Sequence, residues 1–489
     1  MKEYRGEWYT NSTNKIPGIL KLDIISGEIV LELYTQNYFD GTKIFDAGYP
    51  PRFENFILGN TYDGQKITLY HYTGNKNNKG QILVTQQVFH KDFRVIYRPN
   101  FIFIGEHFKT EDDIKFKSYS FEYTFLDSWI DNSSGHFFRN RNDNRDVFIT
   151  NPISPEIIVD VSDETQLQIE HLYESQGELS RELRVKSHYL FTINSKKPQD
   201  LNYFFKISGQ FQTLLTMGVG YPVEIIDEFV VDETYENGVT IVNTFEKVNH
   251  NPKIFNGSMF FSIYDFGPDG IKEIIKNWFL KINEFKPVVD LFIYVVEPFW
   301  KKGNTKVFQT HFTNGFLNMC QALESYYNKD NNLDFNSFKE QFNSRKQDII
   351  GKIQKGKDEI NLSQTELEFI QQNLRKVEKG KDKQDLKIKV ECLLNVASDA
   401  LKGFIDEEEF DKFSNDLAEC RHDLTHINID DSIELLHTKD LAYLFYHSQI
   451  LLYALIANKL MGIEQKKINE ILAKSDKFRM HYKKSKDEN

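Results

Sequence analysis

The stretch from Phe410 to His426 reads FDKFSNDLAECRHDLTH, and it decides the fold class of the C-terminal part of the chain. Its apolar side chains recur at steps of three and four residues: Phe410, Phe413, Leu417, Cys420 and Leu424. Because an α-helix turns once in about 3.6 residues, this spacing places them on one face and predicts a helix over 406–426. One side of that helix is apolar, so it needs neighbouring elements to cover it.

The same helical period continues on both sides of this stretch. An earlier predicted helix carries a longer apolar stripe: Phe308, Phe312, Phe316, Cys320, Leu323 and Tyr327. A capping-box sequence at 363–366 predicts the start of another helix. Further helices are predicted at 334–355, 384–403 and 432–461, and short connections between such helices are typical of a compact all-α bundle.

The residues before 300 follow a different pattern. Apolar and polar residues alternate at 18–34 around Ser26-Gly27 and at 56–69 around Asp63-Gly64, which predicts two hairpins. More strands are predicted at 81–89, 100–105, 119–125, 157–162, 183–193, 239–245 and 258–265, and helices at 199–217 and 269–285. We therefore predict a multidomain α+β protein. Its β-rich antiparallel part covers 1–298 and its helical bundle covers 299–489, with a linker sequence at 301–304.

The charges are distributed unevenly along the chain. Residues 1–300 carry 30 basic and 41 acidic side chains, whereas residues 301–489 carry 30 and 31. An acidic N-terminal part is a poor platform for nucleic acid and fits a sensing role better. Residues 464–489 are rich in lysine, and they form either a tail that contacts phosphates or a frayed, solvated terminus.

Other features of the sequence concern location and bound groups. The apolar run Leu441–Met461 has the length of a membrane span, but polar residues such as His447 and Gln449 interrupt it, so we interpret it as a buried bundle helix. The first residues are charged and do not form a secretory signal. The three cysteines show no metal-site or disulfide spacing. We expect a cytoplasmic protein with no membrane partner, no cofactor and no metal.

Arg421 and His426 carry the chemistry that this sequence suggests. A histidine can move a proton to or from the hydroxyl groups of RNA, and an arginine can hold the phosphate while negative charge builds on it. The 2′-OH supplies the nucleophile, so RNA is cleaved without a metal and DNA is not. A five-residue step in a helix means about 140° of rotation and about 7.5 Å of rise. Either the helix ends or bends between the two residues, or a second copy of the chain completes the site.

Rival interpretations use the same residues. Arg421 could lie on the surface, with His426 as a helix cap. His422 and His426 are four residues apart, and His-Asp-Leu-Thr-His is similar to the His-Glu-x-x-His zinc motif of metalloproteases, although its acid is shorter. Position 432, where a third ligand would stand, is serine, and Glu434 or His437 could replace it. Glu324, close to an apolar helix face, could orient an active-site group or pair with a cation.

Several stretches of the chain, in order, resemble one family. The resemblance lies in Gly6-Glu7-Trp8, Gly27–Leu33, Ile57–Thr61, Ile104–Phe108, Leu126–Ile130, Phe316–Glu324 and Arg421–His426. Together they are similar to the ApeA family of bacterial abortive-infection proteins, which join an ApeA N-terminal domain to a C-terminal HEPN domain.

This resemblance implies a fold, an activity and partners. HEPN domains of this type are homodimeric, metal-independent endoribonucleases in which the Arg-x-x-x-x-His motifs of two protomers share one cleft. Arg421 and His426 would be catalytic, and His422 would take the auxiliary polar position. The implied substrate is host RNA, with tRNA as a candidate, and the N-terminal domain would sense an unknown phage-derived trigger. The alternative is a non-catalytic HEPN protein that binds RNA or a partner, with an N-terminal domain that senses a ligand.

Overall fold

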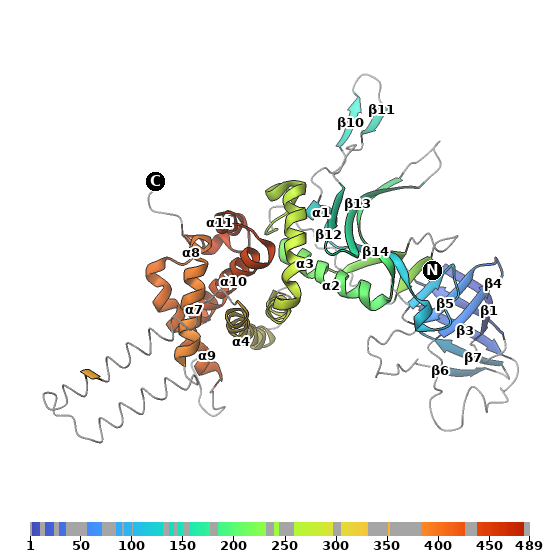
Figure 1. Cartoon of the computed structure of the whole chain (residues 1–489). Coiled ribbons are helices and arrows are strands. Elements are labelled where there is room, and N and C mark those ends of the chain that lie inside the picture. Colours follow the sequence, from blue (N-terminus) through green and yellow to red (C-terminus); the bar gives the residue numbers. More distant parts are fainter. Residues whose placement is uncertain are drawn as a thin grey trace. The chain divides into compact units, whose positions relative to one another are not determined.

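The computed structural model describes most of the chain, in two compact units (Figure 1). The described residues are 2–9, 15–23, 29–35, 56–70, 85–89, 92–99, 101–130, 136–140, 145–149, 156–176, 184–230, 239–243, 259–296, 305–330, 351–352, 383–425 and 438–483. The first unit comprises residues 1–215, 223–254 and 262–272, and the second comprises 216–222, 255–261 and 273–489. A β-rich antiparallel part is thus followed by helices, as predicted. The domain limits 1–298 and 299–489 stay a prediction.

The first unit is built on an antiparallel sheet, in which fourteen described strands run in the order β12-β13-β14-β9-β15-β16-β8-β5-β4-β1-β2-β3-β7-β6. The strands are β1 (Lys2–Tyr9), β2 (Ile16–Leu22), β3 (Ile29–Thr35), β4 (Phe56–Thr61), β5 (Lys66–Tyr70), β6 (Thr85–Phe89), β7 (Asp92–Tyr97), β8 (Phe101–Ile104), β9 (Phe116–Tyr123), β12 (Ile157–Asp160), β13 (Thr165–Gln176), β14 (Arg184–Gln199), β15 (Ile225–Val230) and β16 (Val239–Asn243). Strands β10 (His136–Asn140) and β11 (Arg145–Ile149) pair separately. The predicted hairpins β2–β3 and β4–β5 are confirmed.

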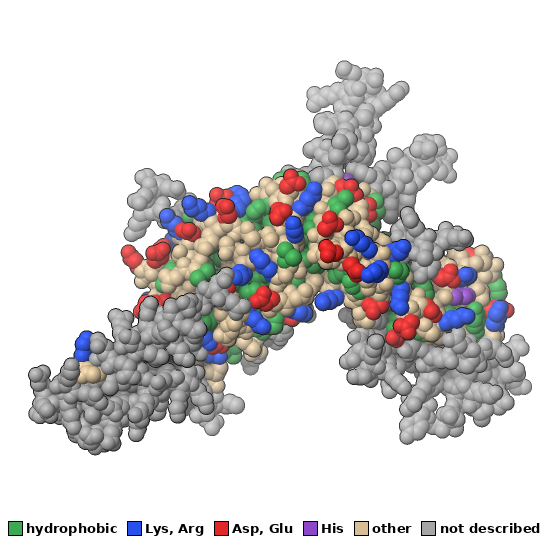
Figure 2. Space-filling model, in the orientation of Figure 1, with side chains coloured by type: hydrophobic (Ala, Val, Ile, Leu, Met, Phe, Trp, Pro, Cys, Tyr) green, Lys and Arg blue, Asp and Glu red, His purple; other side chains and the backbone are tan. Residues whose placement is uncertain are grey.

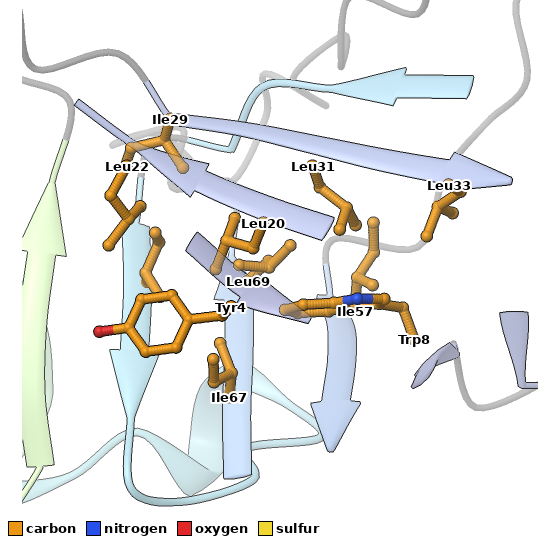
Figure 3. Packing of buried hydrophobic residues seen from close by; sticks show 11 residues of the cluster. Tyr4, Trp8, Leu20, Leu22, Ile29, Leu31, Leu33, Ile57, Ile67 and Leu69 are labelled. Carbon is orange, nitrogen blue, oxygen red and sulfur yellow. The ribbon is translucent and has the colours of Figure 1, made fainter. Parts of the chain in front are cut away.

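The core of the N-terminal strands is organised around Trp8 (Figure 3). Trp8 lies opposite Gly59 in the β1–β4 register, so both face the same side of the sheet. A Cβ atom on Gly59 would lie 2.3 Å from Trp8 Cζ3. The indole therefore occupies the space that any other residue at 59 would need. Leucines and isoleucines of the neighbouring strands surround the ring.

Helix α2 (Leu201–Val219) covers a second, aromatic core on the same sheet. Alternation along β9 points Tyr119, Phe121 and Tyr123 to one buried face of the sheet. There Tyr119 contacts Phe204 and Tyr123 contacts Phe211, both on α2. The Tyr119 hydroxyl donates to the Glu228 carboxylate over 2.5 Å. The buried Tyr119 hydroxyl thus has the hydrogen-bond partner that burial requires. The helix predicted at 199–217 is confirmed.

The second unit is helical in its described parts. Its elements are α3 (Ile263–Val296), α4 (Thr305–Lys329), α7 (Lys383–Val396), α8 (Ser398–Leu401), η4 (Glu407–Glu409), α9 (Phe410–Thr425), α10 (Thr438–Met461), α11 (Gln465–Lys474) and η5 (Arg479–His481). The first unit also contains the short helices η1 (Glu111–Asp113) and α1 (Leu126–Ile130). Helix α10 packs against α4, α7, α8, α9 and α11, which explains why its long apolar run is buried. None of the helices in the described part of the chain is both long and apolar enough to cross a bilayer.

Two predictions for this unit are wrong. Residues 259–262 form no strand and Ile263 begins α3, so the strand predicted at 258–265 does not exist. The apolar pattern there arises because Phe260 is buried between Tyr453 and Phe478, not because it joins a sheet. The expected frayed terminus is also wrong for 464–483, which α11, η5 and their connections occupy. The linker at 301–304 and the predicted helix start at Ser363 lie outside the described residues.

Candidate functional site

Helix α9 holds the candidate site at its C-terminal end. Phe410, Phe413, Leu417 and Cys420 are buried, as their spacing predicts, and Leu424 is half-buried. This face packs against α7, α4 and α10. Burial of the apolar face sets the rotation of the helix, so Arg421, which follows Cys420, lies at the margin of the bundle.

Arg421 forms an ion pair with Glu324 of α4. The distance from Arg421 Nη2 to Glu324 Oε2 is 3.0 Å. The arginine side chain is 38% exposed and the glutamate side chain 22% exposed, so the pair is partly shielded from water and still reachable from it. Two of the predicted site residues, 97 positions apart in sequence, are thereby brought together. Of the two roles considered for Glu324, pairing with a cation is observed, and the cation is the predicted catalytic arginine.

Two buried cysteines lie beside this pair, Cys320 one turn before Glu324 and Cys420 next to Arg421. Burial raises the pKa of Cys320 well above its ordinary range, and Arg421 opposes this effect only in part. Burial raises the pKa of Cys420 to about 12, assisted by Asp423. Both thiols therefore stay protonated near neutral pH and serve as apolar packing, not as nucleophiles.

The remaining candidate residues, His422 and His426, belong to the last turn of α9 and to the residue just after it. The Thr425 hydroxyl donates to the carbonyl oxygens of Arg421, 3.0 Å away, and of His422, 2.9 Å away, both in the last turns of the helix. The side chain of His422 is half-buried. His426 lies outside the described residues, so its position relative to Arg421 stays a prediction, and so does the zinc arrangement with His422. No group of three His, Cys, Asp or Glu side chains suited to a metal occurs within the described ranges.

A second cluster of titratable groups, which was not predicted from the sequence, lies near the start of α9. His447 of α10 is 2% exposed, and its ring packs against those of Tyr443 and His481. Burial lowers the pKa of His447 to about 4, and the nearby His481 and Lys483 act in the same direction. The sequence does show His447 as a polar residue within the apolar run Leu441–Met461. That position was interpreted only as evidence against a membrane span.

Comparison with known proteins gives a family for the chain. Neither a curated protein nor a solved structure matches it. Residues 3–278, which are more than half of the 489 residues, match the family described as ApeA N-terminal domain 1. Apart from Lys2, this range contains all fourteen described strands of the sheet and the cores around Trp8 and α2. The chain belongs to the ApeA N-terminal domain 1 family.

Proposed function

We propose that this protein is an anti-phage defence effector whose helical unit is a HEPN-type, metal-independent endoribonuclease. The pairing of Arg421 with Glu324 is the observation that carries the proposal, because it holds the guanidinium of the predicted motif in a partly shielded position. Membership of the ApeA N-terminal domain 1 family supports the defence role. Acidic and basic side chains are interspersed on the face of each unit seen in Figure 2. Substrate contact on that face would therefore depend on individual side chains and not on a patch of one charge.

In the proposed reaction, Arg421 binds the scissile phosphate and Glu324 is its positioning residue. A guanidinium has five N–H donors, and the ion pair uses one of its nitrogens, which leaves donors for the phosphate oxygens. His426 of one copy takes the proton of the 2′-OH, and His426 of the second copy gives a proton to the leaving 5′-oxygen. The 2′-oxygen bonds to phosphorus as the bond to the 5′-oxygen breaks. The products are a 2′,3′-cyclic phosphate and a 5′-hydroxyl end. In this proposal no metal is needed, because the 2′-OH is the nucleophile and the side chains move the protons and bind the phosphate charge.

The wider proposal concerns partners. Two copies of the chain would bring their Arg421 and His426 residues into one cleft, with His422 as an auxiliary polar group. The substrate would be host RNA, with tRNA as the first candidate. The acidic N-terminal domain would act as the sensor of a phage-derived trigger, since its charge disfavours nucleic acid.

The test compares RNA ends in bacteria that express the full chain. Wild-type protein should produce new 5′-hydroxyl and 2′,3′-cyclic phosphate ends and arrest growth, and Arg421→Ala and His426→Ala should abolish both. Arg5→Ala is the matched control, because Arg5 is a 67% exposed arginine in the other unit. Cleavage that persists in both Arg421→Ala and His426→Ala would disprove the nuclease. RNA binding without cleavage would favour the non-catalytic alternative.

Glu324 is tested separately, by variants that keep or remove its hydrogen bond. Glu324→Gln retains an acceptor oxygen but no charge, whereas Glu324→Ala removes both. Small misplacements of catalytic groups cost up to about a hundredfold in rate, so we expect a loss of roughly tenfold for Gln and roughly a hundredfold for Ala. The loss should lie in kcat more than in KM if Glu324 positions Arg421. Equal rates for wild type and Glu324→Ala would remove the positioning role.

A further inference from the structure

The chain segment after α11 packs back onto the bundle as a strap, defined here as residues 475–483. Phe478 is fully buried, and its ring stacks on that of Phe260 at 5.1 Å. One turn later the His481 ring stacks on Tyr446 of α10 at 4.9 Å. The strap therefore follows one face of α10, from the region of Phe260 to that of Tyr446.

The end of the strap holds the residues that precede α9. The Lys483 ammonium lies 3.2 Å from Asp406 Oδ2 and 2.5 Å from Glu409 Oε2. The backbone N–H of Lys483 donates to the Gly403 carbonyl over 2.6 Å. Asp406 and Glu409 form the reciprocal capping box of η4, and α9 begins at the next residue, Phe410. Lys483 thus ties the strap to the start of the helix that carries Arg421.

A second connection, through His447 of α10, links the strap to the side of α9. The His481 ring meets the ring of buried His447 at 5.3 Å, and the His447 ring meets that of Phe413 at 6.5 Å. Phe413 is one turn into α9. The strap therefore contacts the residues that cap α9 directly, through the charge of Lys483, and reaches the first turn of α9 indirectly, through edge-on ring contacts of His447.

Closure of the strap also buries polar groups unfavourably. Gln449 lies on α10 between Tyr446 and Tyr453, at steps of three and four residues, so it faces the strap side of the helix. It is 1% exposed, and neither of its amide atoms has a hydrogen-bond partner in the described part of the chain. A buried amide without a partner disfavours the state that buries it, because water would satisfy it when the strap opens.

A half-buried cation, Lys477, also disfavours the closed strap. The Lys477 ammonium lies 5.7 Å from the centre of the Phe260 ring and 5.4 Å from that of Phe478. Attraction to the ring faces replaces only part of its hydration, and burial lowers the pKa of Lys477 to about 8. Ring stacking and ion pairs therefore stabilise the closed strap, whereas the poorly hydrated Gln449 and Lys477 destabilise it. A segment that opens and closes reversibly requires such a small difference in free energy between its two states.

We propose that the strap is a reversible latch that regulates the candidate nuclease site by holding α9 in place. When it is closed, Lys483 and His481 hold the start of α9, and the rigid helix carries that restraint to Arg421, twelve residues or about 18 Å beyond Glu409. When it opens, α9 is released at one end and the contact between Arg421 and Glu324 loosens. The regulatory role rests on the proposed function, whereas the latch itself is a property of the fold.

The experiment measures hydrogen exchange in the full chain, for variants that act in opposite directions. Gln449→Met keeps the size of the side chain and removes the buried amide, so strap amides should exchange roughly tenfold more slowly. Lys483→Ala and His481→Ala remove closing contacts, so the strap and the first turns of α9 should exchange several-fold faster. Lys474→Ala is the matched control, because it removes an exposed lysine of α11 just before the strap. Faster strap exchange in Gln449→Met, or unchanged α9 exchange in Lys483→Ala, would overturn the latch.

RNA cleavage by the same variants tests the regulatory role. Lys483→Ala should lower cleavage several-fold and Gln449→Met should preserve it. Hydrogen exchange is read without any activity, so a wild-type chain that cleaves no RNA would refute the proposed function, while exchange would still decide the latch. Normal cleavage by Lys483→Ala, together with faster α9 exchange, would overturn the regulation.

Discussion

Acidification should destabilise the second unit through His447. This histidine is almost fully buried, and its Nδ1 lies 2.8 Å from the Tyr443 carbonyl oxygen. Burial lowers its pKa from 6.5 to about 4, His481 and Lys483 assist, and Glu409 opposes. In the unfolded chain the ring returns to its ordinary pKa and binds a proton between pH 6.5 and 4, when the folded chain does not. The free energy of unfolding should therefore be unaffected above pH 6.5 and fall as pH drops toward 4, by about 3 kcal/mol in total.

Urea denaturation at pH 7, 6, 5 and 4 measures this loss, with His447→Gln as the comparison. Glutamine is neutral throughout this range and can still hydrogen-bond to the backbone, so the variant should lose about 3 kcal/mol less stability than the wild type between pH 7 and pH 4. All other titrating groups are common to both proteins and cancel in the difference. Equal losses would mean that His447 does not bind protons differently in the folded and unfolded chains, and the argument from burial would fail.

Three further predictions concern the cores. Gly59→Ala should destabilise the first unit by about 2 kcal/mol or more, because the new Cβ would overlap the Trp8 ring. Chemical denaturation measures this loss, and an unchanged midpoint would contradict the close packing. Thr68→Val should cost about 2–4 kcal/mol in the same assay, since the Thr68 hydroxyl bonds two backbone groups at residues 106 and 108, and wild-type stability would refute that role. Cys320 and Cys420 should resist thiol reagents in the native protein and react on unfolding, which mass spectrometry shows; rapid native labelling would contradict their burial.

The local elements could be predicted because their signals are local. Apolar residues from Phe410 to Leu424 predict α9 from its period alone, and the turn at Asp63-Gly64 predicts the β4–β5 hairpin. The same reasoning failed at Phe260, where an apolar run of strand type is buried among rings of the helical unit. A short apolar run predicts that a segment is buried, but it does not predict which elements cover it.

The sequence alone determined the division into a β-rich and a helical part, the helix that carries Arg421 and the family resemblance in the N-terminal part. Only the tertiary structure decided which distant groups meet: Glu324 with Arg421, Trp8 with Gly59, and the strap with the start of α9. The physical reason is that helical and strand periods depend on neighbours along the chain. Ion pairs and stacked rings between elements depend on the rotation and register that close packing of the whole core imposes.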